Sequence, residues 1–183
     1  FVDGVCGHPE IVVWLRPEAA DLIRPMVRPD ADLRLYDPAH PDHLELVVVF
    51  GGDGTILRAA EWALPAQVPL LGVNLGHVGF LAELETAQMH VLIDRVLRRD
   101  YRVEERLCLE VELRDRPGGE LLWSSYAINE VSLEKAARER MIEVLVQIDG
   151  HPLQRWGTDG VLVSTPTGST AYAFSAQGPV MWP

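Results

Sequence analysis

The sequence around residue 50 reads Leu46-Val-Val-Val-Phe50, followed at once by Gly51-Gly-Asp-Gly-Thr55. A short apolar run without polar alternation predicts a strand buried on both faces, as in a parallel α/β sheet. The segment from Ile56 to Leu64 has few helix breakers, so we expect a helix whose N-terminus lies near Thr55. A glycine turn between such a strand and a helix N-terminus is a place where phosphates bind.

The turn itself contains an unexpected carboxylate. Gly51, Gly52 and Gly54 allow positive φ angles and let a ligand approach bare backbone N–H groups. Asp53 has the wrong charge to hold a phosphate, so its presence indicates chemistry, or a metal, beside the phosphate. Gly-Gly-Asp-Gly also suits an ordinary turn, and short glycine motifs give many false matches. The rest of the chain has to decide between these interpretations.

Composition narrows the class of protein. With 183 residues, 48% of them hydrophobic, the chain can bury a real core in one large domain or two small ones. The formal net charge of −11 argues against a nucleic-acid partner, which requires a basic face. Lys135 is the only lysine and no Gly-Lys-Ser/Thr occurs, which excludes a Walker A loop. Any phosphate binding must therefore use backbone N–H groups, helix dipoles and arginines.

Cysteine usage and hydropathy indicate the cellular compartment in which we expect the protein. Cys6 and Cys108 are far apart and form no disulfide framework, so we interpret them as thiols in a reducing cytosol and expect a cytoplasmic protein. No apolar run approaches the ~18 residues of a membrane span, and the N-terminus lacks a secretory pattern, so we expect no membrane partner. His40 and His43 resemble metal ligands in type, but in a proline-rich loop we interpret them as solvated.

The first half of the chain alternates between strand and helix patterns. Before residue 46 come an apolar run at Ile11–Leu15, a helical pattern at Pro17–Arg24 and an alternating strand at Asp32–Tyr36. Val68–Asn74 is the next strand, and a second glycine-rich loop, Asn74-Leu-Gly-His-Val-Gly-Phe80, follows it. Because consecutive parallel strands end at one edge of a sheet, we expect both glycine loops to face one crevice. Residues 86–99 then form an amphipathic helix.

After about residue 101 the pattern becomes that of β-structure. Strands are predicted at Leu107–Leu113, Leu121–Leu133, Ile142–Ile148 and Val161–Ser164. Asp149-Gly150 between apolar runs is a strong hairpin signal. We therefore predict an α/β N-terminal domain with a parallel sheet and a nucleotide-binding glycine loop, residues 1–100, and a β-rich second domain, residues 101–183.

Two polar groups in the β-rich half are not required by β-structure. Asn129-Glu130 lies between apolar neighbours, where the solvent face of a strand is the ordinary interpretation. The run Thr165-Pro-Thr-Gly-Ser-Thr-Ala-Tyr172 leaves an apolar strand directly and is dense in hydroxyl groups. Such a run predicts a tight turn lined with donors and acceptors, which suits a sugar, adenine or phosphate better than it suits a polar surface loop.

Taken together, these motifs resemble those of NAD kinases. The stretches that carry the resemblance, in the same order along the chain, are Gly51–Thr55, Asn74–Leu81, Asn129-Glu130 and Asp159–Tyr172. The resemblance runs from about residue 45 to the end of the chain, and its last motif is the most specific. Gly-Gly-Asp-Gly alone is shared with phosphofructokinases and with diacylglycerol and sphingosine kinases. A lipid or sugar kinase of the same superfamily, and an inactive truncated nucleotide-binding module, therefore stay open as alternatives.

The resemblance implies a phosphofructokinase-like first domain and a defined reaction. ATP or polyphosphate would phosphorylate the 2′-hydroxyl of the adenosine ribose of NAD, which gives NADP. Mg²⁺ or another divalent cation would be bound mainly through the donor phosphates, without an all-protein metal site. The family normally continues well past the equivalent of Pro183, so the second domain is expected to be incomplete at its C-terminus. The resemblance also implies a homo-oligomer that associates through the β-rich half.

The resemblance further assigns roles to single residues. Asp53 would be the catalytic residue, as general base or orienting group for the hydroxyl, because a carboxylate can accept a proton late in a loose phosphoryl-transfer transition state. The phosphoryl donor would be bordered by Gly51, Gly52, Gly54 and Thr55. NAD would be held by Asp53, Gly54, Arg58, Phe80, Asn129, Glu130, Arg140, Asp159, Thr170, Ala171, Tyr172, Ala173, Phe174 and Ser175.

Overall fold

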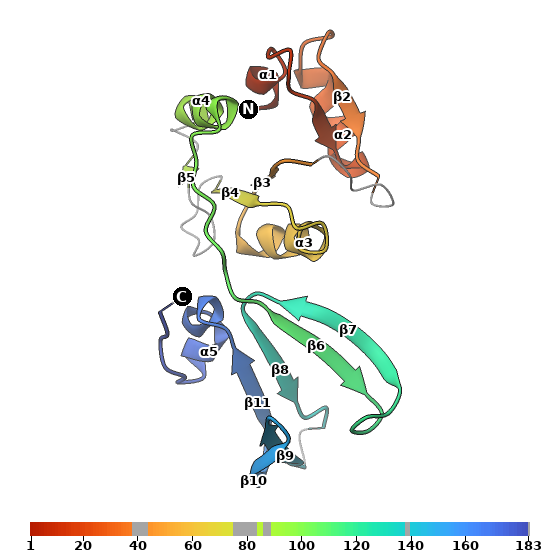
Figure 1. The fold of residues 1–183 in the computed structure, drawn as a ribbon, viewed down its shortest axis with the longest axis vertical. Helices are drawn as coiled ribbons and strands as arrows, with labels where there is room; N and C mark the ends of the chain where they lie inside the picture. The colour runs from red at the N-terminus through yellow and green to blue at the C-terminus, as the bar shows by residue number, and fades with distance from the viewer. Residues whose placement is uncertain (38–43, 75–83, 86–88, 138–139, 183) are drawn as a thin grey trace. The chain divides into compact units, whose positions relative to one another are not determined.

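The structure is a computed structural model, and it describes residues 1–37, 44–74, 84–85, 89–137 and 140–182. The chain divides into two compact units, unit 1 from Phe1 to Val103 and unit 2 from Glu104 to Pro183 (Figure 1). Helices and parallel strands make up unit 1, whereas unit 2 consists mainly of antiparallel strands.

Unit 1 is an α/β unit. Its elements in chain order are α1 (Val2–Val5), β1 (Val13–Leu15), α2 (Pro17–Ile23), η1 (Arg24–Met26), β2 (Leu33–Leu35), β3 (Val47–Phe50), α3 (Asp53–Ala63), β4 (Leu70–Asn74), β5 (Leu84–Glu85) and α4 (Met89–Arg98). β1 pairs with β2 in parallel, and β3, β4 and β5 form a second parallel sheet. The parallel α/β sheet expected from the alternation of strand and helix patterns is therefore present.

The register of β3 against β4 sets the edge at which the glycine turn lies. Phe50 is opposite Val73, and the Gly51 N–H donates to the Val73 carbonyl oxygen at 3.0 Å. The two strands therefore end side by side, as expected for consecutive parallel strands. The second glycine-rich loop, including Phe80, and the residues His40 and His43 lie outside the described residues.

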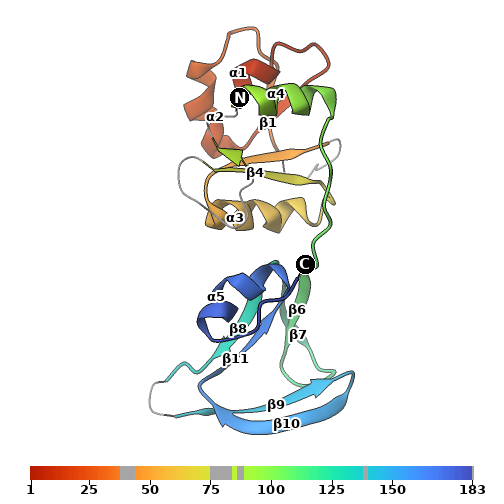
Figure 2. The same cartoon turned by 90° about the vertical axis from the view of Figure 1, so that its left-hand side faces the viewer.

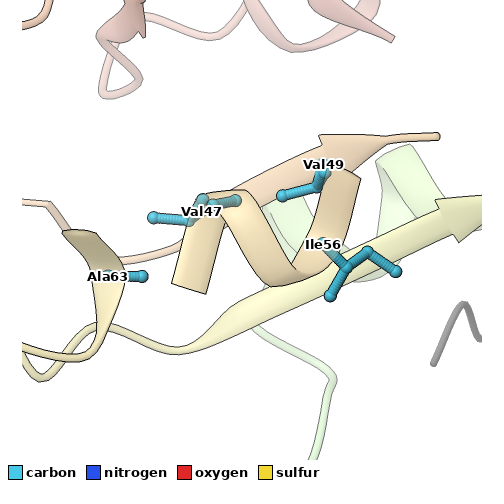
Figure 3. Packing of buried hydrophobic residues seen from close by; sticks show 5 residues of the cluster. Val47, Val49, Ile56 and Ala63 are labelled. Atoms are coloured by element: carbon cyan, nitrogen blue, oxygen red, sulfur yellow. The ribbon is translucent and has the colours of Figure 1, made fainter. Parts of the chain in front are cut away.

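The core of unit 1 lies between β3 and α3. Its buried members, seen together in Figure 3, are Val47, Val49, Ile56, Ala59 and Ala63. Burying a valine or isoleucine side chain fully contributes about 1.5–3 kcal/mol, so this contact is a main source of stability for the turn that connects the two elements. Figure 2 shows α3 lying along β4, which is consistent with the contacts of α3 with both strands.

The prediction that β3 is buried on both faces is only half right. Val47 and Val49 are buried, but the alternate residues Val48 and Phe50 are half-buried. The Phe50 ring is in contact with the ring of Phe1, with centroids 5.3 Å apart and a tilted geometry. One aromatic ring covers less surface than a packed helix, so the second face of β3 keeps some exposure.

Unit 2 is β-rich. Its elements are β6 (Leu109–Arg114), β7 (Leu121–Ala127), β8 (Glu130–Glu134), β9 (Ile142–Ile148), β10 (His151–Thr158), β11 (Gly160–Ser164), η3 (Thr167–Thr170) and α5 (Tyr172–Ser175). The antiparallel pairs are β6 with β7, β8 with β11, and β9 with β10 (Figure 1). The hairpin predicted at Asp149-Gly150 is confirmed, because both residues have positive φ, 50° and 77°, as a two-residue type I′ turn requires.

The stretch Leu121–Leu133, predicted as one strand-like segment, is two strands. β7 ends at Ala127 and β8 begins at Glu130, so Ile128 and Asn129 form a break between them. β7 pairs with β6, whereas β8 pairs with β11. Apolar residues flank Asn129-Glu130 on both sides, so the pair resembles the solvent face of one continuous strand and the sequence alone does not reveal the break. Within the described ranges, the structure contains no helix that is long and apolar enough for a membrane span.

Candidate functional site

The glycine turn of unit 1 connects the end of β3 to the start of α3. Asp53 is half-buried and is the first residue of α3, two residues before the expected start at Thr55. The Gly52 carbonyl oxygen accepts hydrogen bonds from the N–H groups of Thr55 (2.9 Å) and Ile56 (3.2 Å), which closes the first helical turn. The start of a helix carries about half a positive charge. The Asp53 carboxylate therefore stands at an anion-attracting helix end.

The three glycines of this turn have different surroundings. A Cβ atom added at Gly52 or Gly54 would meet no described heavy atom within 4 Å, and both residues are exposed. A Cβ atom added at Gly51 would lie 2.7 Å from the Thr55 hydroxyl oxygen. Gly51 is thus needed for packing inside the turn, whereas Gly52 and Gly54 leave free space along its outer side. A ligand can reach the backbone there.

One cation lies on the same helix as this open space. Arg58 is exposed and follows Gly54 by four residues on α3. Residues four apart share a helix face, so the guanidinium group is on the side of α3 that the exposed glycine occupies. An arginine in this position suits an anionic ligand at the start of the helix.

In unit 2 the structure brings the Asn129-Glu130 pair against the hydroxyl-rich turn. The Thr165 N–H donates to the Asn129 carbonyl oxygen at 2.9 Å, and Ser164 at the end of β11 pairs with Glu130 at the start of β8. Gly168 is buried, and a Cβ atom there would overlap the backbone carbonyl of Asn129. The interpretation of Asn129-Glu130 as the solvent face of a strand is therefore wrong for Asn129, which lies at a strand break and is held by its backbone.

Glu130 has the features of a ligand-binding carboxylate. Burial raises the pKa of this side chain above its ordinary value. Its Oε2 atom is buried and has no hydrogen-bond partner in the described part of the chain. A buried acceptor without a donor is unfavourable, and a ligand hydroxyl or amide would satisfy it.

The segment from Thr170 to Ser175 follows the turn and includes the short helix α5. Thr170 and Ala171 are half-buried, Ala173 is buried, and Tyr172, Phe174 and Ser175 are exposed. The Tyr172 hydroxyl donates to Oε1 of Glu134 at 3.3 Å. Glu130, Ser132 and Glu134 alternate along β8 and share one face, so Tyr172 reaches along that face. This segment presents two exposed aromatic rings beside polar side chains.

Asp159 and Arg140, which the resemblance also assigns to NAD, lie apart from Asn129. Asp159 precedes β11, and because Gly160 pairs with Glu134, it lies at the opposite end of the β8–β11 pair from Asn129. Its carboxylate forms an ion pair with Lys135 at 2.6 Å. Arg140 is exposed just before β9. The structure does not bring either residue together with Asn129.

Within the hydroxyl-rich run, the residues that the resemblance assigns to NAD begin at Thr170 and leave out Thr165 and Ser169. Thr165 and Ser169 are both fully buried, and the Ser169 hydroxyl donates to the Pro166 carbonyl oxygen at 2.7 Å and accepts from the Met181 N–H at 2.9 Å. These residues, with Gly168, determine the shape of the turn. The many hydroxyl groups and the glycine in this run predicted a tight turn. The sequence alone did not show which of the hydroxyl groups are buried.

Few titratable groups elsewhere suggest a separate site. In the described ranges, no three His, Cys, Asp or Glu side chains gather in a way that could hold a metal ion. Cys6 and Cys108 are free thiols, and burial raises the pKa of each. Each unit therefore has candidate residues of its own: the Asp53 turn in unit 1, and the Asn129–Thr165 group with residues 170–175 in unit 2.

The fold and these residues define a class: a two-domain protein, α/β then β-rich, with a glycine turn at a helix N-terminus in its first domain. Two family models match the chain. The ATP-NAD kinase N-terminal domain matches residues 22–101, and the ATP-NAD kinase C-terminal domain matches residues 128–183. Together they cover most of the chain, which belongs to the NAD kinase family.

Individual relatives agree with this assignment. An NAD kinase from Cutibacterium acnes is 66% identical over 139 residues, which are 76% of this chain and 43% of that protein. NAD kinase 2 from Streptomyces coelicolor is 48% identical over 172 residues, 92% of this chain and 55% of that protein. The chain thus spans about half the length of the curated relatives it matches.

Solved structures with the same fold are also NAD(H) kinases. Yeast NADH kinase in complex with NADH has a TM-score of 0.84 and 28% identity, over 96% of this chain and 54% of that chain. An NAD kinase from Archaeoglobus fulgidus in complex with ATP has a TM-score of 0.60 and 25% identity, over 94% of this chain and 66% of that chain. The two-domain architecture predicted from the sequence is therefore confirmed.

Proposed function

We propose that the protein containing this chain is an NAD kinase, which transfers the terminal phosphoryl group of ATP, or of polyphosphate, to the 2′-hydroxyl of the adenosine ribose of NAD. The observation that carries the proposal is the Gly51–Thr55 turn, which puts a carboxylate at the N-terminus of α3 beside open space. Membership of the NAD kinase family supports it. The product is NADP.

In this proposal Asp53 orients the 2′-hydroxyl by accepting its hydrogen bond. Phosphoryl transfer passes through a loose transition state, so the bond to the attacking oxygen forms late and the hydroxyl keeps its proton until then. A carboxylate is a weak base for a free sugar hydroxyl, but it can take the proton once bond formation has made the oxygen acidic. Asp53 would then return the proton to water. This position is at the N-terminus of α3, where the partial positive charge of the helix would stabilise both the donor phosphates and the carboxylate.

The donor phosphates would lie along the outer side of the glycine turn. Gly52 and Gly54 leave that side open, and Gly51 with Thr55 form its inner wall. Thr55 is exposed and offers a hydroxyl donor at the start of α3. A divalent cation, Mg²⁺ by expectation, would arrive with the nucleotide as part of that substrate, because Mg²⁺ is held mainly by substrate phosphates in such reactions. It would neutralise charge on the donor phosphates.

The proposed contacts with the dinucleotide rest on the chemistry of single residues. Asn129, Glu130 and the segment Thr170–Ser175 would hold the ribose and adenine, because they combine an unpartnered carboxylate oxygen with exposed aromatic rings. Arg58 would contact an anionic part of the dinucleotide. Phe80, Arg140 and Asp159 stay in the proposal as contacts that the family resemblance implies.

We further propose a cytoplasmic homo-oligomer that associates through the β-rich unit. Many large apolar side chains of that unit are exposed, among them Trp123 at 54% and Leu113 at 55% on the β6–β7 pair. Contiguous exposed apolar surface of this kind marks an interaction site. The two free thiols agree with a reducing compartment.

The first experiment measures NADP formation from NAD and Mg-ATP, with polyphosphate as a second donor, using the complete protein that contains this chain. Asp53→Asn keeps the shape of the side chain and removes its basicity. We expect turnover to fall by about 10²–10⁴-fold, the range for loss of general acid–base catalysis, with little change in NAD binding. Glu61→Gln is the matched control, because Glu61 is an exposed carboxylate on the same helix, and it should keep wild-type turnover.

Each other outcome has a definite meaning. Turnover near wild type in Asp53→Asn would remove Asp53 from its catalytic role. Saturable NAD binding without NADP formation in the wild type would favour a binding module without activity. Absence of both would refute the proposal, and assays with sphingosine and diacylglycerol would then test the lipid-kinase alternative.

A further inference from the structure

The break between β7 and β8 leaves backbone carbonyl groups that no strand partner takes. Ile128 and Asn129 form this break, and a buried carbonyl group needs a donor from elsewhere. Thr165, 36 residues further along the chain from Asn129, supplies it. Its N–H donates to the Asn129 carbonyl oxygen at 2.9 Å, and its hydroxyl donates to the Ile128 carbonyl oxygen.

The same hydroxyl group also determines the start of the turn. Its oxygen accepts the Gly168 N–H at 3.0 Å and lies 3.1 Å from the Asn129 carbonyl oxygen. A hydroxyl has one proton and two lone pairs, so it can donate on one side and accept on the other. Thr165 uses both capacities at once. It connects the strand break to the turn through a single atom.

The contact is too close to be replaced by water or by a longer side chain. Thr165 is 0% exposed. Gly168 packs directly on the Asn129 backbone, where even a Cβ atom would overlap the carbonyl group. The separation between the break and the turn is therefore set by Thr165 and by the absence of a side chain at Gly168.

We propose that Thr165 is a positioning residue for the dinucleotide: its hydroxyl holds the Asn129-Glu130 pair and the Thr170–Ser175 segment at the spacing that the bound NAD requires. The inference rests on the proposed function and adds a residue to it. Asn129 and Glu130 are attached to the backbone that Thr165 holds on one side, and residues 170–175 follow the turn that it holds on the other. Small errors in placement matter, because a displacement of about 1 Å can reduce catalysis 10²-fold.

The test compares Thr165→Val, which keeps the shape but removes the hydroxyl, with Thr165→Ser, which keeps the hydroxyl. Steady-state kinetics of the complete protein would be measured with NAD and Mg-ATP varied in turn, alongside the thermal midpoint of unfolding. We expect Thr165→Val to raise the KM for NAD about tenfold, the effect of a lost hydrogen bond between buried groups, with no change in the KM for ATP. Thr165→Ser should restore the KM for NAD to within about twofold of wild type.

Thr158→Val is the structural control. The Thr158 hydroxyl donates to the Gly160 carbonyl oxygen at 2.8 Å, within its own turn, so its loss should lower the thermal midpoint without changing the KM for NAD. If Thr165→Val behaves in the same way, Thr165 acts on stability alone and the inference is wrong.

Equal impairment of Thr165→Ser and Thr165→Val would also overturn the inference. A wild type that neither binds nor phosphorylates NAD would instead refute the proposed function itself. If Thr165→Val does not fold, Thr165→Ser is measured alone: a raised KM for NAD in a Ser variant as stable as the wild type would overturn the inference, because the hydroxyl is still present.

Discussion

Gly54 in unit 1 has open space beside its Cα atom, whereas Gly168 in unit 2 is packed against the backbone of Asn129. A side chain at Gly54 would meet no described atom within 4 Å, whereas one at Gly168 would overlap the backbone of Asn129. Both residues belong to glycine-containing turns that follow a strand, and sequence reasoning treats them alike. The first glycine leaves open space at the start of α3, and the second lets two backbone segments pack together.

This difference separates the two turns at which we propose that ligands bind. At the Asp53 turn the protein leaves room for a ligand and offers helix N–H groups and Arg58 around it. At the Thr165 turn the protein uses buried hydroxyls to hold segments that then present Glu130 and Tyr172. Substitutions in the first region should change binding without lowering stability, whereas substitutions in the second should lower stability as well.

The largest effect is expected for Gly168→Ala. The added methyl group has to displace the Asn129 backbone, and overpacking of this kind costs about 3 kcal/mol or more. We expect unit 2 to unfold at a clearly lower denaturant concentration, measured by circular dichroism and tryptophan fluorescence. Gly118→Ala is the control: Gly118 has φ of 69° but open space around it, so the cost there should be only about 1 kcal/mol. Equal effects of the two substitutions would contradict the packing argument.

A smaller and opposite effect on stability is expected for Gly54→Ala. Alanine is favoured over glycine in a helix by up to about 1 kcal/mol, and nothing described obstructs its methyl group, so the protein should become slightly more stable. The methyl group would occupy space that the phosphoryl donor needs, and we expect the KM for ATP to rise about tenfold. Differential scanning calorimetry and steady-state kinetics measure the two quantities. An unchanged KM for ATP would show that the open space is not the donor site.

The smallest effect is expected for Glu130→Gln. Because burial raises the pKa of Glu130 in the folded protein above its unfolded value, the folded state binds more protons and ionisation opposes folding. The stability of the wild type should therefore fall as the pH rises from ~4 through the raised pKa. Glu130→Gln removes this dependence, so its unfolding midpoint should exceed that of the wild type slightly at neutral pH and match it near pH 4.

Unfolding midpoints at several pH values would check the prediction, with Glu110→Gln, at an exposed carboxylate in the same unit, as control. A difference that grows as the pH falls would have the wrong sign. A loss of NAD affinity in Glu130→Gln but not in Glu110→Gln would add support to its proposed contact with the dinucleotide.

Much of the fold could be predicted because its signals are local. Five apolar residues at 46–50 predicted β3, the breaker-free segment after Thr55 predicted α3, and Asp149-Gly150 predicted the hairpin of β9 and β10. Each signal depends on backbone preferences of neighbouring residues. The split of residues 121–133 into two strands was missed, because nothing in the local apolar pattern says that one half pairs with β6 and the other with β11.

By itself, the sequence determined the family, the Asp53 turn and the order of strands and helices, since these depend on motifs and on residues close together in the chain. Only the tertiary structure decided that Thr165 holds Asn129, that Gly168 is a packing glycine, and that Asp159 lies at the far end of the β8–β11 pair. The physical reason is that a contact between residues 36 positions apart depends on which strands pair and in which register. That pairing is a property of the folded chain and not of any short segment.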